Sequence, residues 1–128
     1  MAETGAKRAK AKPEKRAKAK QEKRAKAAVD HEVELSVNES GEFTYDPSFV
    51  RVKRGDTVTF GNPKGQSFAV MFKDQSPGNR LSLSDRDPTI KINHDAPYAV
   101  YHYAAAVFDG NKGQVHLDSG CGDIGVEN

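Results

Sequence analysis

Apolar and polar residues alternate along most of the chain after residue 29, and this pattern predicts a β-rich domain. Val33, Leu35 and Val37 alternate with polar residues, which is typical of a strand with one buried face. Clusters of Gly, Pro, Asn and Asp separate the apolar segments, and no helical period appears. Seven or eight short strands in about a hundred residues predict an all-β sandwich. Phe43 and Tyr45 continue the first alternation as far as Asp46-Pro47, and the strand segments that we expect after it are 50–52, 57–60, 68–72, 89–92, 98–108, 114–117 and 123–126.

Two segments carry more specific expectations about burial. Residues 68–72 are apolar at successive positions, which predicts a central strand buried on both faces. Met71 in this strand is interpreted as a core-filling side chain. Residues 73–88 are rich in Asp, Ser, Pro and Gly, so we expect a long excursion across the surface, anchored by Leu81 and Leu83.

The first part of the chain has a different composition, with a basic repeat of eight residues. The blocks KRAKAKPE, KRAKAKQE and KRAKAAVD follow one another from residue 7 to residue 30, and before Val29 the only apolar residues are Met1 and alanines. Residues 1–28 hold 11 Lys and Arg against 3 Glu, a net charge of +8, while the remaining residues carry −6. Such a segment cannot bury enough apolar surface to offset the entropy of ordering it. We therefore divide the chain into a disordered or partly helical basic tail, residues 1–29, and a sandwich domain, residues 30–128.

The repeat favours binding to a polyanion. Eight residues advance a helix about 80° beyond two turns, so the positive charge winds round the axis and no apolar stripe forms. Nucleic acid is the leading partner, because released counterions drive binding without base contacts. A solubilising extension without a dedicated partner is the alternative, and membrane insertion is not expected because the tail lacks aromatic residues and leucine. The KRAKAK blocks resemble the tails of histone H1-like proteins. The expected nucleic-acid-binding residues are Lys7, Arg8, Lys10, Lys12, Lys15, Arg16, Lys18, Lys20, Lys23, Arg24 and Lys26.

Three motifs of the domain resemble those of the cupredoxins, the plastocyanin-like proteins. FTYDPSFVRVKRGDTVTFGN, residues 43–62, is similar to the family's opening motif. SFAVMF, residues 67–72, stands where the first ligand strand is expected, and APYAVYHYAAAV, residues 96–107, resembles the approach to the copper-ligand loop. The resemblance runs from about residue 33 to the C-terminus, and it implies a cupredoxin-like Greek-key sandwich.

The ligands of a type 1 copper site are missing from this pattern. Such a site takes two His and a Cys, usually with a weak axial Met. The resemblance places the first His near residues 65–68, the Cys near 104–106, and the second His and the Met within 108–112. None of these segments contains His, Cys or Met, so we predict a copper-free domain without a cofactor.

Other chemistry has weaker support in the sequence. His94, His102, His116 and Cys121 lack the spacings of zinc or iron sites, so no metal site is predicted, and His102 is interpreted as a hydrogen-bonded structural residue. Cys121 lies between two glycines and is a possible reactive thiol, or else a small packed side chain. No catalytic motif is present, which predicts a non-enzymatic protein.

The sequence therefore leaves three alternative hypotheses for the function. The first is polyanion binding by the tail, and the second is redox or metal handling by Cys121 with nearby histidines. The third is docking of a protein partner on an apolar surface of the domain. The basic N-terminus lacks the apolar segment of an export signal, and the chain has 1 Cys, so a cytoplasmic location is expected.

Overall fold

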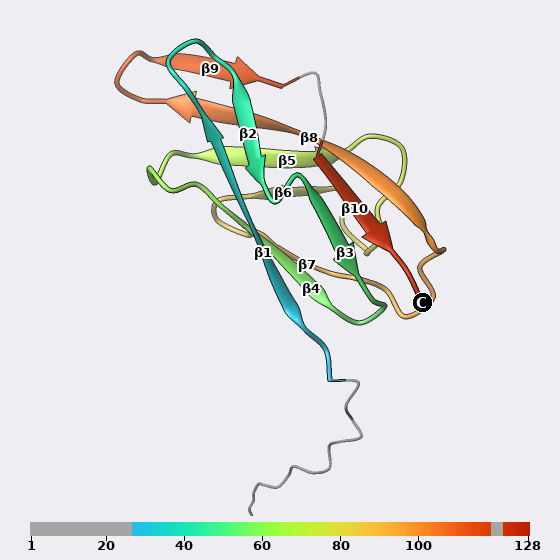
Figure 1. Cartoon of the computed structure of the whole chain (residues 1–128). Coiled ribbons are helices and arrows are strands. Elements are labelled where there is room, and N and C mark those ends of the chain that lie inside the picture. The colour runs from blue at the N-terminus through green and yellow to red at the C-terminus, as the bar shows by residue number, and fades with distance from the viewer. Residues whose placement is uncertain (1–26, 119–121) are drawn as a thin grey trace, which may run out of the picture.

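The computed structural model describes residues 27–118 and 122–128, and all of their regular secondary structure is β (Figure 1). Within these residues ten strands form two sheets. The first sheet has the order β2-β1-β4-β7, and the second has the order β3-β10-β8-β5-β6 with β9 paired to β8. The predicted all-β sandwich is confirmed. The strands are β1 Asp30–Val37, β2 Phe43–Asp46, β3 Phe49–Val52, β4 Thr57–Gly61, β5 Phe68–Phe72, β6 Ser82–Ser84, β7 Thr89–Lys91, β8 Ala99–Asp109, β9 Gln114–Leu117 and β10 Gly122–Val126.

Both sheets combine parallel and antiparallel pairs. β1 pairs with β2 in antiparallel and with β4 in parallel orientation, and β3 pairs in parallel with β10. The chain passes from β2 in the first sheet to β3 in the second through a cis bond between Asp46 and Pro47. The chain crosses between the two sheets again after β3, β4, β6 and β7.

The core lies between the two sheets and is built from alternate residues of each strand. Tyr103 of β8 is fully buried at its centre. Its ring meets Tyr45 and Phe60 of the first sheet edge to face, with centroids 5.3 and 5.1 Å apart, and Phe72 of its own sheet at 6.1 Å. These aromatic pairs join the two layers and add to the free energy gained by burial.

The prediction that residues 68–72 are buried on both faces is wrong. Phe68, Val70 and Phe72 are buried, but Ala69 and Met71 point to the outer face, and Met71 is 61% exposed. β5 lies between β8 and β6 in the sheet, yet in the part of the chain that the structure describes no layer covers its outer side. Met71 is therefore a surface residue and not a core filler.

The segment 73–88 is anchored differently from the prediction. Leu83 lies in β6 and is buried, as expected, whereas Leu81 is 63% exposed. Pro77 takes the second anchoring position: it is fully buried, and its carbonyl accepts a hydrogen bond of 2.9 Å from the backbone of Asn93. Pro77 therefore holds the segment 73–88 against the domain, although the composition had suggested only a turn residue at this position.

Candidate binding surface on the second sheet

Apolar side chains gather on the outer face of the second sheet. Six large ones are between 45% and 77% exposed, and they come from β3, β5, β8 and β9. Monomeric proteins rarely leave so many large apolar side chains together on one face, and such patches mark interaction sites. We call this set the outer apolar face. Its members are Phe49, Met71, Val100, Phe108, Val115 and Leu117, with Ala69, Ala104 and Ala106 between them.

The strand register explains why these side chains share one face. Ala106 of β8 lies opposite Ala69 of β5 on one side and opposite Leu117 of β9 on the other. Phe108 lies opposite Val115. Directly paired residues project to the same side of a sheet, so the three strands present one continuous apolar surface.

An alanine-floored groove runs across this face. Its volume is about 390 Å³, and the small side chains of Ala69, Ala104 and Ala106 form its floor. Met71 and Leu117 line the same groove, and they are 61% and 77% exposed. Large protruding side chains and a hollow between them therefore lie next to each other on one surface.

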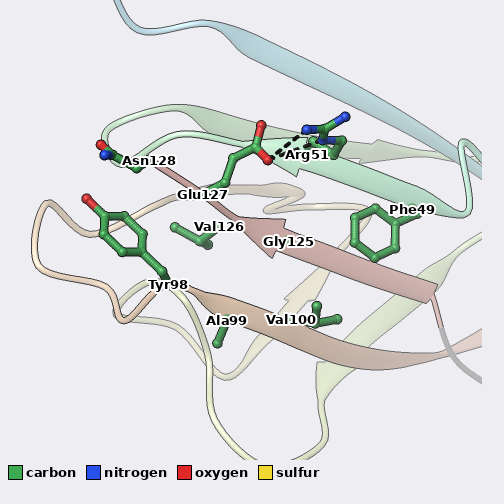
Figure 2. A pocket seen from close by; sticks show the side chains of 9 residues that line it. All are labelled: Phe49, Arg51, Tyr98, Ala99, Val100, Gly125, Val126, Glu127 and Asn128. Atoms are coloured by element: carbon green, nitrogen blue, oxygen red, sulfur yellow. Dashed lines mark hydrogen bonds and ion pairs between the residues drawn. The ribbon is translucent and has the colours of Figure 1, made fainter.

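A second groove, of about 510 Å³, lies at the other end of the sheet (Figure 2). The Phe49 ring covers Gly125 of β10 closely enough that a Cβ at that position would lie 2.9 Å from the ring. Arg51 donates two hydrogen bonds, of 3.0 and 3.2 Å, to Glu127 Oε1 at the rim. Tyr98 also lines this groove, which is therefore apolar at its base and charged at its edge.

His102 and Asp123 separate the two grooves. His102 projects from β8 on the outer face between Val100 and Ala104, and its Nδ1 lies 2.5 Å from Asp123 Oδ1 on β10. The hydrogen bond expected of His102 is confirmed, whereas its structural role stays a prediction. This pair is the main polar interruption of the outer apolar face.

The outer face of the first sheet is acidic. Asp30, Glu32 and Glu34 project from the outer side of β1, and Asp46 of β2 lies opposite Glu34. Asp30 Oδ1 accepts a hydrogen bond of 2.6 Å from Thr57 Oγ1 on β4. The two outer surfaces of the sandwich thus differ in character, one apolar and one negatively charged.

Asp56 fixes the point at which the chain enters β1. Its side chain is buried, and its carboxylate accepts hydrogen bonds from the backbone nitrogens of Val29 and Lys53, at 3.0 and 2.9 Å. His31 Nε2 lies 2.9 Å from Asp56 Oδ2, the oxygen that also accepts from Lys53, while Val29 donates to Oδ1. Burial by itself raises the pKa of Asp56, but the hydrogen bonds from Val29, His31 and Lys53 outweigh it and hold the pKa below its ordinary value. The carboxylate therefore stays ionised and ties the base of the tail to the β3–β4 turn.

The residues predicted to bind nucleic acid, from Lys7 to Lys26, lie outside the described residues, and so does Cys121. The three histidines that the sequence analysis considered beside Cys121 do not converge. His94 packs against Gly55 of the β3–β4 turn, His116 lies near Gly41 beyond the opposite end of β1, and His102 is on the outer face of β8. No observation among the described residues therefore favours redox or metal handling by histidines acting together.

The two loops to which the resemblance assigns copper ligands do lie side by side. Residues 64–67 and 108–111 line one common hollow. Their side chains include the amides of Gln66 and Asn111, the carboxylate of Asp109 and the ammonium group of Lys64, none of which is the imidazole or thiolate of a type 1 site. Over residues 27–118 and 122–128, no three His, Cys, Asp or Glu side chains are placed to hold a metal ion together. The donor set at this end of the sandwich does not fit copper.

Sequence reasoning anticipated an apolar docking surface on the domain but did not locate it. The signal for its location was the run 98–108, which is largely apolar in both phases of a strand and was interpreted only as one of the expected strands. In β8 the residues Tyr101 and Tyr103 fill the core, while Val100 and Phe108 stay on the surface. The described residues also include no helix with the length and apolar character needed to cross a membrane.

No protein-family model matches the chain, and the search of curated proteins found no match either. Among solved structures, a pseudoazurin from Sinorhizobium meliloti is similar, with 22% identity and a TM-score of 0.47 over 78% of this chain and 75% of that one. A pseudoazurin from Methylobacterium extorquens AM1 has 19% identity and a TM-score of 0.46 over 77% and 76% of the two chains. Pseudoazurins are cupredoxins, and these similarities concern the fold alone. The domain is an all-β sandwich of two mixed sheets, and its cupredoxin character stays a prediction from its motifs.

Proposed function

We propose that this chain is a non-enzymatic binding protein whose basic tail contacts nucleic acid or another polyanion. The observation that carries the proposal is the separation of charge along the sequence. Residues 1–28 have a net charge of +8 and the remainder has −6, within a total of +2. A tail of this composition attracts a polyanion, whereas the domain as a whole repels one.

The tail would bind through its charge and not through base contacts. Each Lys or Arg that neutralises a phosphate releases condensed counterions, and this release favours binding at low salt. The repeat contains no aromatic residue to stack on a base, and its positive charges wind round the axis with no side of a helix set apart for reading bases. We therefore expect weak sequence preference and a strong dependence on salt.

The domain would position the tail and limit how closely the polyanion approaches. Val29 is tied to Asp56 by a hydrogen bond of 3.0 Å, so the tail leaves the sandwich at a defined point. The carboxylates of Asp30, Glu32 and Glu34 follow directly on the outer side of β1. A polyanion bound to the tail thus meets negative charge as soon as it approaches the first sheet.

The test is the affinity of the full chain for two duplexes of unrelated sequence across a series of salt concentrations. The logarithm of the binding constant should fall linearly with the logarithm of salt concentration, with a slope of about −0.9 for each neutralised phosphate and therefore up to about −10 for the whole tail. Both duplexes should give the same slope. A flat salt dependence would contradict the proposal.

Two variants locate the binding in the tail. A chain lacking residues 1–26 should lose measurable binding, while circular dichroism shows that its sandwich remains folded. A full-length variant with Lys7, Arg8, Lys10 and Lys12 changed to Gln should give a slope less negative by about 3 to 4. Unchanged slopes in this variant would place the contacts elsewhere.

A further inference from the structure

We propose that the outer apolar face binds a second copy of this chain, so that two sandwiches associate face to face through their second sheets. This inference is independent of the tail. It rests on the area of the face, on its shape and on the distribution of charge over the described residues.

The area is sufficient for a stable dimer. Six large apolar side chains are between 45% and 77% exposed. With about 150 to 200 Å² of surface for each such side chain, they expose roughly 600 Å² of apolar surface, close to the about 800 Å² that each partner buries in a standard interface. The alanines and the rim of the face supply the remainder.

The shape is self-complementary. Met71 and Leu117 protrude beside a groove of about 390 Å³ whose floor is formed by Ala69, Ala104 and Ala106. In a twofold arrangement the same surface serves both partners, so the protruding side chains of one copy can enter the groove of the other. Small residues at the centre allow the two sheets to approach closely, as they do in the interior of a sandwich.

The charge distribution permits this pairing. The groove contains no Lys, Arg or Glu, and its one charged lining residue is Asp118. His102 and Asp123 are paired with each other. The net charge of this pair is zero when His102 is protonated and −1 when His102 is neutral. The acidic residues Glu32 and Glu34 lie on the opposite sheet, and association through the second sheet keeps these acidic faces apart. A charged partner, in contrast, would find few complementary charges in the groove.

The test is the mass of the full chain measured by sedimentation over about a hundredfold range of concentration, since association follows mass action. The mass should rise from that of one 14.0 kDa chain towards twice that value. Leu117→Lys places a charge beside the groove and should weaken association at least tenfold. Leu81→Lys is the matched control, because Leu81 is 63% exposed but lies outside the face, and it should associate like the unchanged chain.

Met71→Lys provides a second change on the face, and circular dichroism with thermal unfolding should show all three variants folded.

The sedimentation is repeated at high salt, where apolar association persists while contacts of the basic tail with residual polyanion are released. A chain with the mass of a monomer at every concentration overturns the proposal, as does equal weakening by Leu81→Lys. Loss of the dimer at high salt assigns association to bridging polyanion and also overturns it. The salt slope of duplex binding can be measured at concentrations below those at which the chain associates, so the two proposals fail separately.

Discussion

Gly122 and Gly125 of β10 stand on opposite faces of the same strand, and their surroundings differ sharply. A Cβ at Gly122 would overlap the ring of Tyr103, which is fully buried between the sheets. A Cβ at Gly125 would lie 2.9 Å from the ring of Phe49, which is 46% exposed and can move away. Core packing therefore requires glycine at position 122. At position 125 a side chain would only displace an exposed ring.

We predict unequal costs for the two corresponding substitutions. Gly122→Ala should lower the free energy of unfolding by about 3 kcal/mol or more, because a close-packed core cannot absorb an additional methyl group. Gly125→Ala should lower it by less than about 1 kcal/mol, because an exposed ring adjusts at small cost. Urea denaturation of both variants measures the difference. Similar costs would show that Tyr103 is not held as tightly as its burial indicates.

At the scale of elements, Asp56 joins the start of β1 to the β3–β4 turn. Asp56→Asn replaces one carboxylate oxygen with an NH₂ group that faces the donors of Val29, His31 or Lys53. We expect the substitution to lower the free energy of unfolding by about 2 to 3 kcal/mol at neutral pH, because buried donors lose a charged acceptor. Urea denaturation provides the measurement, and Asp95→Asn, at an exposed position, provides the control.

The pH dependence of this effect has a definite sign. The pKa of Asp56 is lower in the folded chain than its ordinary value, so ionisation favours folding. The stabilisation is complete above the unfolded carboxyl pKa of about 4, and it is lost as the pH falls through the lower folded value. The gap in stability between the unchanged chain and Asp56→Asn should therefore narrow below about pH 4. A gap that widens on acidification would contradict this assignment.

The strands show how far the sequence predicts the fold and where it fails. Alternation of period two identifies β1 because one of its faces is buried and the other is charged. The same rule predicts burial wrongly at β5 and β8, where the residues on both faces of the strand are apolar. A strand that is buried on both faces and a strand with one exposed apolar face have the same sequence pattern. The exposure of Met71 depends on which layer covers β5, and this is a property of the whole topology.

The missing copper ligands were predictable, whereas the outer apolar face was not. The absence of His and Cys from residues 65–68 and 104–106 is visible in the sequence once the motifs give the alignment. The outer apolar face combines side chains such as Phe49 and Leu117, which are distant in the sequence and brought to one surface only by strand order. No local pattern carries the information that two such residues share a face.

For the whole molecule, the important feature is that the sandwich has two dissimilar outer faces and one basic tail. The tail enters β1 in the first sheet, beside Asp30, Glu32 and Glu34. The outer apolar face belongs to the second sheet. A dimer through the second sheet would leave both tails and both acidic faces accessible, and two tails on one particle would bind a long polyanion with higher avidity than one.

The acidic face should weaken polyanion binding by the neighbouring tail, and single substitutions can measure this effect. We predict that Glu32→Gln increases affinity for a duplex about twofold at physiological salt, because it removes one repulsive charge near the start of β1. Glu39→Gln is the matched control, since it makes the same chemical change in the turn beyond the far end of β1. Glu39 lies seven residues after Glu32, and at about 3.3 Å per residue this spans roughly 20 Å, more than twice the screening length of about 8 Å. Fluorescence anisotropy with a labelled duplex gives both affinities, and the effect of Glu32→Gln should vanish at high salt. Equal effects of the two substitutions would show that the net charge of the domain matters, and not the position of its acidic face.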